Sequence, residues 1–300
     1  MDWVSVSLVS AFLFAIVAVL DKKLLAAYMP VRVFCFLVGL LQFLMAALVL
    51  VIEPWNSSPS MTMWLIGMSS GLSWGLGTML MFYGFSRLEV SRVIPIAHTY
   101  PVFVAIMASI FLGESLSAVQ WVAILITVTG AGVVATSRGQ QTSNTNSTLV
   151  YLLVLLGSVL NAIANVTYKY ALDGIEFWDL FAMRAVCLGV VLLAVGYRAG
   201  IVSQVRRLTS NMACVRVFVI AEIVVAPAAI VAMLGALYLG PVSLASTLIS
   251  VRPLFVLAIT GILSMPMLRF LDEPFTRETL PLKLLSTSMV VVGVAVLTLA

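Results

Sequence analysis

Apolar residues fill most of the chain in runs of about 17–25 residues, the length of a helix that crosses a hydrocarbon core of roughly 30 Å. The runs are too continuous for the alternation of a barrel strand, and a helix satisfies its own backbone hydrogen bonds in lipid. Short polar or Gly/Pro-rich breaks separate the runs. The pattern predicts ten membrane helices over residues 3–24, 32–52, 62–85, 90–112, 120–136, 149–171, 177–197, 215–237, 241–264 and 282–299.

One break has the composition of a linker. The stretch "SRGQQTSNTNS" begins at residue 137 and lies between the fifth and sixth predicted helices. It predicts two five-helix halves, residues 1–136 and 149–300, joined by a polar linker at 137–148. Because each half has an odd number of helices, the two halves must enter the membrane in opposite directions. We therefore predict an all-α polytopic membrane protein built as two inverted five-helix repeats, an architecture that many secondary transporters share.

Short stretches of the two halves can be aligned in the same order. "NVTYKYAL" aligns with "AVLDKKLL" and places Lys169 opposite Lys22. "SVRPLFVLAITGIL" aligns with "HTYPVFVAIMASIF" and places Pro253 opposite Pro101, with Arg252 opposite Tyr100. The alignment supports an internal repeat.

The segment "PIAHTYPVFVAIMASIFLGESLSAVQWVAILITVTGAGVVA" (95–135) resembles the EamA-type repeat of the drug/metabolite transporter (DMT) superfamily, and the second half repeats it more loosely. The resemblance implies a ten-helix carrier. Members of that superfamily include exporters of amino acids and other metabolites, and relatives that exchange nucleotide sugars or sugar phosphates. The resemblance therefore leaves the transported solute open.

The composition agrees with a membrane protein, since 62% of the residues are hydrophobic and 9% are charged, against about 25% charged residues in a typical soluble domain. The small excess of Lys and Arg, 16 against 12 acidic residues, fits membrane orientation better than nucleic-acid binding. The 3 cysteines show no metal-ligand or disulfide spacing, and no phosphate-binding or dinucleotide motif is present. We expect no metal and no cofactor.

The orientation in the membrane has two interpretations. Most Lys and Arg residues fall in the odd-numbered connections, and by the positive-inside rule both termini would then lie outside. The resemblance to the superfamily implies both termini in the cytoplasm instead.

Arg252 is the charge that lies deepest in an apolar run. It falls near the midpoint of the ninth predicted helix, roughly 17 Å from either end at about 1.5 Å per residue, too far for its side chain to reach the interface. The adjacent Pro253 cannot donate a backbone hydrogen bond and would loosen the helix there. A guanidinium beside a broken helix can clamp a carboxylate or phosphate. The alternative is a structural ion pair with Glu222.

Two further charges lie inside predicted helices. Glu222, in "VIAEIVVAP", is either a proton-coupling residue or the counter-ion of Arg252 or Arg184. Arg184, in "LFAMRAVC", lies about two turns into the seventh helix. It either binds substrate or reaches the membrane interface with its long side chain.

The matched lysines Lys22 and Lys169 lie at helix ends, where lysine side chains normally reach the head groups. Their recurrence raises the alternative that they face a central cavity and attract an anionic group. Asp21 is interpreted as a local partner of Lys22.

Uncharged candidates for a cavity lining come from several helices. His98 is the single histidine and lies between Pro95 and Pro101, in a segment where titration during transport or a hydrogen bond to a freed carbonyl are both reasonable. Asn161 and Asn165 are four residues apart and share a helix face. The remaining candidates for the lining are Ser69, Ser73, Trp74, Thr78 and Tyr100, and those for gating kinks are Pro95, Pro101 and Pro253. Interhelical hydrogen bonding is the alternative for each polar group.

The stretch "GLSWG" (71–75) spells the motif of a hydrolase nucleophile elbow. That motif requires a strand before it and a helix after it, whereas here it lies inside a predicted membrane helix. Small residues four apart are better explained by close helix packing. We therefore expect no enzyme.

The sequence predicts a secondary-active carrier in the cell membrane, an exporter or exchanger that moves a small polar, anionic or zwitterionic metabolite such as an amino acid by alternating access. Its expected partners are the solute, membrane lipids, protons or a counter-substrate, and a second copy in a homodimer, without nucleic acid. A lipid-phosphate or lipid-head-group translocase and a non-transporting intramembrane enzyme are the alternatives.

Overall fold

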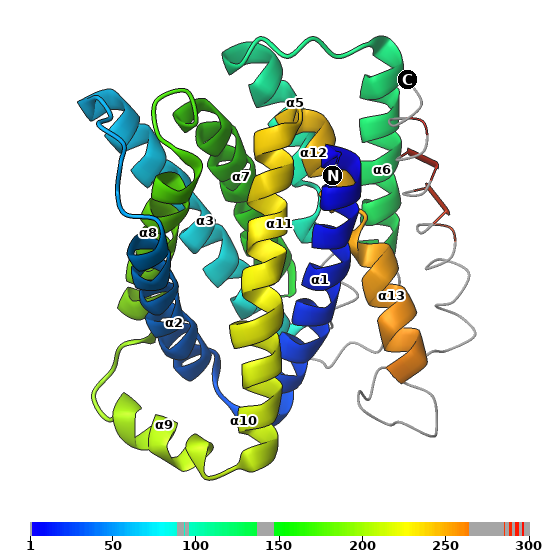
Figure 1. Cartoon of the computed structure of the whole chain (residues 1–300). Coiled ribbons are helices and arrows are strands. Elements are labelled where there is room, and N and C mark those ends of the chain that lie inside the picture. Colours follow the sequence, from blue (N-terminus) through cyan, green and yellow to red (C-terminus); the bar gives the residue numbers. More distant parts are fainter. Residues whose placement is uncertain are drawn as a thin grey trace.

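The computed structural model describes residues 2–88, 93, 96–136 and 147–263, together with residues 285, 288–289, 292–293 and 296. All regular structure in these residues is helical (Figure 1). The helices are α1 (Trp3–Lys23), the π-helical turn η1 (Leu24–Tyr28), α2 (Val31–Ile52), α3 (Met61–Arg87), α5 (Tyr100–Phe111), α6 (Ala118–Thr136), α7 (Ser147–Ala171), α8 (Phe177–Gly196), α9 (Ile201–Thr209), α10 (Met212–Phe218), the π-helical turn η2 (Val219–Val225), α11 (Ala226–Leu239), α12 (Val242–Ile249) and α13 (Arg252–Leu263).

Six helices of the described residues are long and apolar enough to cross a membrane. They are Trp3–Tyr28, Val31–Ile52, Met61–Arg87, Thr148–Ala171, Phe177–Gly196 and Met212–Leu239, and each coincides with a predicted helix. The ninth predicted helix is broken at residues 250–251 into α12 and α13, because Pro253 at the second position of α13 has no backbone N–H to continue the ladder. Most of the tenth predicted helix and of the linker lies outside the described residues.

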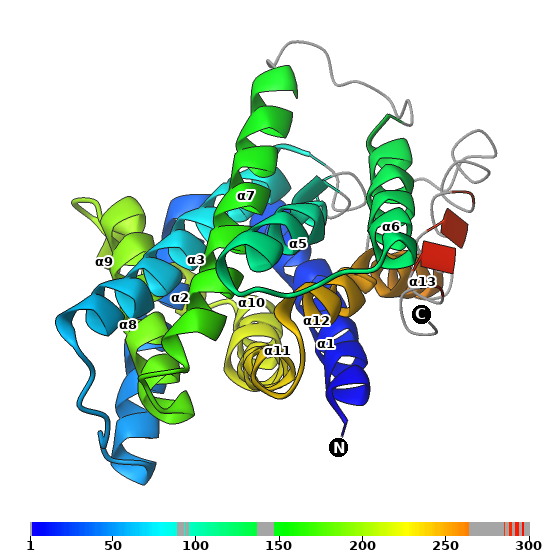
Figure 2. The same ribbon diagram turned by 90° about the horizontal axis from the view of Figure 1, so that it is seen from above.

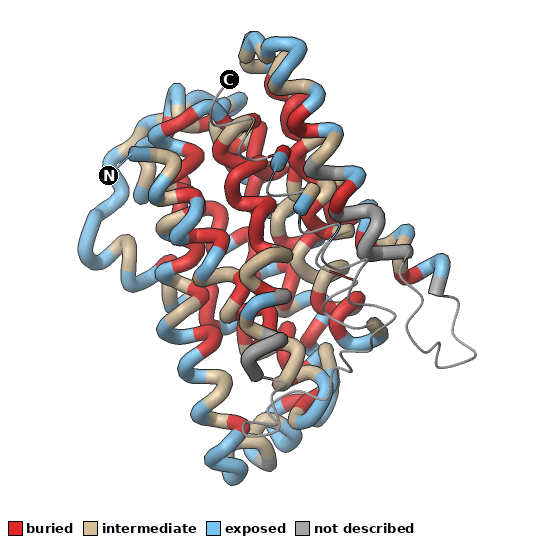
Figure 3. Tube along the Cα trace, turned by 90° about the vertical axis from the view of Figure 1, so that its right-hand side faces the viewer, coloured by how far each residue is buried: buried red, intermediate tan, exposed pale blue. Residues whose placement is uncertain are grey.

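The outer surface of the bundle is apolar, as the exposed residues of α2 illustrate. Leu40, Leu44 and Leu48 recur every four residues along α2 and are 47%, 64% and 54% exposed. Val38 and Gln42, on another face of the same helix, are buried. Exposed apolar faces of this extent do not occur on ordinary soluble monomers, and lipid accounts for them. Figure 3 shows buried and exposed stretches alternating along the helices.

Glycines allow α3 to pack tightly against α8. Gly67, Gly71 and Gly75 recur every four residues, and a Cβ added at Gly71 would lie 2.6 Å from Cβ of Cys187 and 2.9 Å from Cα of Arg184. Only a residue without a side chain permits this approach. The interpretation of "GLSWG" as a helix-packing motif is therefore confirmed.

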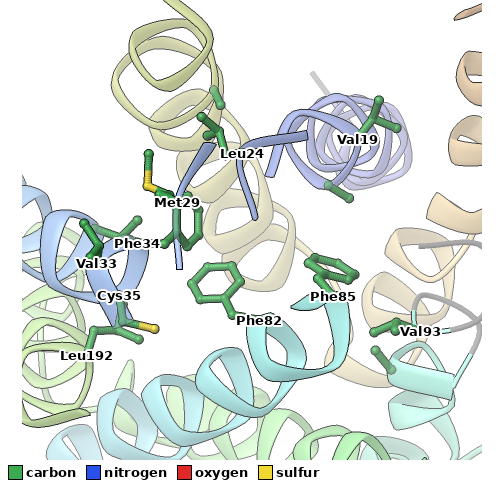
Figure 4. Close-up of a cluster of buried hydrophobic side chains, with 14 of the residues drawn as sticks. Val19, Leu24, Met29, Val33, Phe34, Cys35, Phe82, Phe85, Val93 and Leu192 are labelled. Atoms are coloured by element: carbon green, nitrogen blue, oxygen red, sulfur yellow. The ribbon is translucent and has the colours of Figure 1, made fainter. Parts of the chain in front are cut away.

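Two large apolar clusters fill opposite ends of the bundle. The first, named here the α9-side cluster, includes Leu24, Phe34, Phe82, Phe85 and Leu192 (Figure 4). Its aromatic rings meet edge to face, with the centroids of Phe34 and Phe82 4.8 Å apart. The second, the α12-side cluster, includes Val104, Tyr168, Leu180, Leu237 and Val242. Helices α3, α8 and the span η2–α11 contribute one end to each cluster, so the two clusters close the bundle at its two ends.

The loop after α5 is tied to the second half of the chain. The Glu114 carboxylate accepts hydrogen bonds from the backbone N–H groups of Val242, at 2.7 Å, and Ser243, at 3.2 Å, and from the Ser243 hydroxyl. A carboxylate at a helix N-terminus also complements the helix dipole. This contact fixes the start of α12 against α5, whereas α6 lies at the rim of the bundle (Figure 2).

Candidate functional site

A cavity of about 110 Å³ lies between the two apolar clusters. Val38, Phe82, Ala97 and Leu188 of the α9-side cluster line it from one direction, and Tyr100, Ile230, Met233 and Ile249 of the α12-side cluster line it from the other. Its polar lining consists of Asp21, Gln42, Trp74, Thr78, His98, Asn161, Asn165, Glu222 and Arg252. The structure thus brings together eight of the residues predicted from the sequence: Trp74, Thr78, His98, Tyr100, Asn161, Asn165, Glu222 and Arg252.

Arg252 enters the cavity from a helix break. It is the first residue of α13, follows the turn at residues 250–251 and is 6% exposed. Its guanidinium lies 5.2 Å from the centroid of the Phe14 ring and interacts electrostatically with Asp21. The predicted break beside Pro253 is therefore present, and it places the charge at a helix start that faces the cavity.

The break recurs at the aligned position of the first half. Tyr100 and Pro101 are the first two residues of α5 and follow a turn at residues 98–99, as Arg252 and Pro253 follow the turn before α13. The Tyr100 hydroxyl donates a hydrogen bond of 3.0 Å to the carbonyl of Ser246 in α12. Both helix starts lie at predicted proline kinks, and Tyr100 and Arg252 both line the cavity. The third predicted kink, Pro95, lies outside the described residues.

Two carboxyl groups lie in the same cavity lining as Arg252, and one of them, that of Asp21, interacts with its guanidinium. Asp21 of α1 and Glu222 of η2 lie beside one another in the cavity lining and are 1% and 4% exposed. Oδ1 of Asp21 and Oε1 of Glu222 have no hydrogen-bond partner among the described residues. Glu222 lies in a π-helical turn, a deviation from α-helix that is frequent at functional sites. Glu222 therefore has a second carboxyl group, that of Asp21, as its neighbour.

Uncharged polar groups complete the lining. The His98 ring lies 5.7 Å from the Tyr100 ring, and Nδ1 of His98 has no hydrogen-bond partner among the described residues. Asn161 and Asn165 lie on one face of α7, as their spacing predicts. These amides, with Gln42 of α2, can donate to and accept from a polar solute.

Arg184 lies next to the cavity without lining it. It is fully buried in α8, so it does not reach the membrane interface. Its guanidinium lies 4.6 Å from the centroid of the Trp74 ring and 4.8 Å from that of Tyr168. Each cation–π contact contributes about 0.5–2 kcal/mol, whereas burying an ion costs several kcal/mol even after relaxation. The two rings alone do not offset the burial of this charge.

The matched lysines lie at helix ends outside the cavity lining. Nζ of Lys22 donates hydrogen bonds to the carbonyls of Phe85, at 2.9 Å, and Leu88, at 2.8 Å, near the end of α3. Nζ of Lys169 donates to the carbonyls of Leu237, Tyr238 and Gly240 near the end of α11, at 2.9, 3.1 and 2.9 Å. Helix-end carbonyls lack intrahelical partners. Each lysine therefore ties together one end of the bundle, and its predicted contact with substrate stays a prediction.

Asp21 and Gln42 are the lining residues that the sequence interpretation missed. Adjacent residues of an α-helix point about 100° apart, so Asp21 turns into the cavity while Lys22 turns toward α3. Gln42 is the single amide or charged side chain between Val33 and Ile52, and that isolation was an available indication. Within the described residues, no group of three or more metal-ligating side chains converges on a possible metal site.

Comparison with known proteins agrees with this geometry. Residues 1–136 match the EamA-like transporter family, which belongs to the DMT superfamily. No curated protein matches the chain. One solved crystal structure aligns with 97% of this chain and 98% of its own, with a TM-score of 0.63 and 14% sequence identity, a likeness that shows the fold alone. The predicted resemblance is therefore confirmed over residues 1–136, which match the EamA-like transporter family, and the protein is an integral multi-pass membrane protein.

Proposed function

We propose that the protein is a secondary carrier of the cell membrane that exports or exchanges a small zwitterionic metabolite, such as an amino acid, by alternating access. The observation that carries the proposal is the cavity between the two apolar clusters, whose lining combines one guanidinium with two carboxyl groups. A solute carboxylate would pair with the Arg252 guanidinium, and a solute ammonium would lie against Asp21 and Glu222. The amides of the lining would hydrogen-bond the rest of the polar head.

The size of the cavity favours a small solute. Its volume is about 110 Å³, and cavities of about 150 Å³ hold one benzene-sized molecule. A compact amino acid fits this scale, whereas a nucleotide sugar does not unless the cavity widens. The apolar side chains of the lining, such as Phe14 and Met233, suit an uncharged solute side chain.

The two apolar clusters are the gates of the proposed cycle. In the inverted-repeat arrangement, residues 1–136 and 149–300 would rock against one another around the cavity, with the linker at 137–148 between them. The equivalent helix starts at Tyr100 and Arg252 support this repeat, as do the equivalent lysines. Opening at the α9-side cluster would strain the contacts of Lys22, and opening at the α12-side cluster those of Lys169.

Coupling would use the carboxyl pair. A cation between Asp21 and Glu222 relieves the repulsion of two adjacent carboxylates, so a proton and a solute ammonium would compete for one place. His98 lies within electrostatic reach of Arg252 and is a second candidate for proton transfer. Exchange against a counter-substrate would use the same competition without a proton.

The lipid-head-group alternative needs an arginine that faces the membrane through a lateral opening. Arg252 is 6% exposed and Arg184 is fully buried. Their burial favours a soluble solute over a lipid.

A thermal-shift screen of the detergent-purified protein against amino acids, organophosphates, nucleotide sugars and lipid phosphates tests the proposal. We expect an amino acid to raise the melting temperature, and we expect its N-acetylated and decarboxylated analogues, which each lack one charge, to fail. Arg252→Gln should lose the response, whereas Arg198→Gln, a change at an exposed arginine beyond α8, should keep it. An equal shift of the wild type and Arg252→Gln would remove Arg252 from the site.

A further inference from the structure

Buried polar atoms without a protein hydrogen-bond partner fall into two groups within the described residues. The first group has one atom each from the cavity-lining residues Asp21, His98, Glu222 and Arg252, and one from Ser246, whose carbonyl accepts from the cavity-lining Tyr100. The second group consists of the Tyr168 hydroxyl and all three guanidinium nitrogens of Arg184. Buried polar atoms are paired in the great majority of cases. A solute in the cavity accounts for the first group and leaves the second unexplained.

The second group is a set of hydrogen-bond donors. A guanidinium has donors and no acceptor, and the Tyr168 hydroxyl can turn its proton toward a ligand. The groups of the described chain that interact electrostatically with Arg184 are Tyr168 and Cys187, and no described carboxylate is among them. The ligand that satisfies several donors and one positive charge is an oxyanion, either a carboxylate or a phosphate.

The group lies beside the cavity. Trp74 lines the cavity, and its ring is 4.6 Å from the guanidinium of Arg184. Along α7, the cavity-lining Asn161 and Asn165 are followed by Tyr168 on the same helix face, at spacings of four and three residues. A polar face of α7 therefore leads from the cavity to Arg184.

The group also lies toward a groove on the surface. Leu172, four residues beyond Tyr168 on that face, lines a groove of about 640 Å³ together with Asp173, Glu176 and Tyr238. Tyr238, which lines the groove, lies near Tyr168. Arg184 and Tyr168 thus lie within the α12-side end of the bundle, between the cavity and this groove.

We infer that Arg184 and Tyr168 form a second oxyanion-binding site, separated from the cavity by the Trp74 ring and placed on the route to the surface groove. The inference rests on the proposed function in one respect: the anionic group of the solute would leave Arg252 for Arg184 when the α12-side cluster opens. A free inorganic anion can supply the same chemistry.

Inorganic phosphate is the probe for the site. We expect phosphate to raise the melting temperature of the wild type and of Arg252→Gln by about 2–4 °C at a concentration near ten times the dissociation constant. Arg184→Gln should lose this specific response. Phosphate also stabilises proteins by exclusion from their surface, so sulfate-matched and chloride-matched buffers are compared for every variant. An equal phosphate response in Arg184→Gln would overturn the inference.

Tyr168→Phe keeps the inference testable if Arg184→Gln does not fold. That variant retains both rings around the guanidinium and removes one donor, so it should fold and bind phosphate about tenfold more weakly. An unchanged phosphate affinity in Tyr168→Phe would contradict a site that includes its hydroxyl.

The source of the anion is assigned by the solute found in the screen. If the solute supplies it, Arg184→Gln should bind that solute normally and transport it at least tenfold more slowly. Normal transport together with a lost phosphate response would assign the site to a free anion. Failure of the proposed function would be distinct, because Arg252→Gln would then leave solute binding unchanged.

Discussion

Two buried arginines, Arg252 and Arg184, share an aromatic environment and differ in their charged neighbours. Arg252 lies 5.2 Å from the Phe14 ring, and Arg184 lies 4.6 Å from the Trp74 ring. Arg252 has the Asp21 carboxyl in electrostatic reach, whereas Arg184 interacts with Tyr168 and Cys187. A buried cation beside acids suits a zwitterion, and a buried cation among donors suits an anion. Because both arginines are buried, burial does not distinguish the role proposed for Arg252 from the role proposed for Arg184.

The backbones of the two arginines also differ. Arg252 starts α13 directly after a turn, where the helix axis can change direction. Arg184 lies inside α8 where Gly71 of α3 approaches within contact distance of its Cα atom. The cavity arginine therefore lies at a hinge, and the second arginine belongs to a tightly packed frame. In the proposed cycle Arg252 changes its position and Arg184 does not.

The largest expected effect comes from removing both acids of the cavity, so that Arg252, like Arg184, has no carboxylate of the described residues near it. The double variant Asp21→Asn/Glu222→Gln leaves Arg252 as a cation without acids, like Arg184. Loss of two charge-assisted hydrogen bonds should weaken zwitterion binding by at least about 100-fold, because each contributes about 1.5–3 kcal/mol. The N-acetylated solute, which lacks the ammonium, should gain affinity. Thermal-shift titration measures both, with the exposed Glu53→Gln as control, and an unchanged zwitterion affinity would exclude the carboxyl pair from binding.

Glu222→Gln alone separates binding from coupling. If Glu222 carries the proton, uptake into proteoliposomes should depend on pH for the wild type and lose that dependence in the variant. Asp21→Asn serves as the comparison, since it removes the neighbouring acid. Uptake that stays equally pH-dependent after Glu222→Gln would remove this residue from the coupling step.

The hydrogen bonds of Lys22 and of Lys169 should each limit the opening of a different end of the bundle. Lys169→Met removes three hydrogen bonds at the end that contains Arg184, so a membrane-permeant maleimide should label Cys187 about tenfold faster. Lys22→Met should instead speed labelling of Cys35 and Cys214, which belong to the α9-side cluster. Each variant is the control for the other. Equal acceleration of all three cysteines would mean general loosening of the fold and would contradict separate gates.

The smallest effect concerns the ring that separates the two sites. Trp74→Leu removes the stacking on Arg184 and should lower stability by about 0.5–2 kcal/mol, whereas Trp74→Phe keeps a ring and should lose less. Thermal unfolding in detergent measures the difference. A Trp74→Leu protein as stable as Trp74→Phe would show that the stacking does not stabilise the buried charge.

Much of this arrangement followed from sequence spacing. The length of the apolar runs predicted the six long spans, and the aligned prolines at 101 and 253 predicted the helix breaks that bring Tyr100 and Arg252 to the cavity. The four-residue spacing of Asn161 and Asn165 predicted their common face. These are local properties, fixed by helix geometry and by the missing N–H of proline.

The rest depended on contacts between distant segments. The alignment pairs Lys22 with Lys169, but their hydrogen-bond partners are carbonyls more than sixty residues away, at the ends of α3 and α11. The sequence indicates only the neighbouring Lys22 as a partner of Asp21, because the groups that surround Asp21 come from the distant segments η2 and α13. Arg184 was placed near an interface by its distance from the helix end, and only the packing of α3 and α7 around it shows that it is buried.

The most direct test of the central claim is a comparison of binding and transport of the same zwitterionic solute by the wild type, Arg252→Gln and Arg184→Gln. We predict that Arg252→Gln loses both binding in the thermal-shift assay and uptake into proteoliposomes, and that Arg184→Gln keeps binding. Solute binding by Arg252→Gln at wild-type affinity would contradict the claim that the cavity between the two apolar clusters is the substrate site.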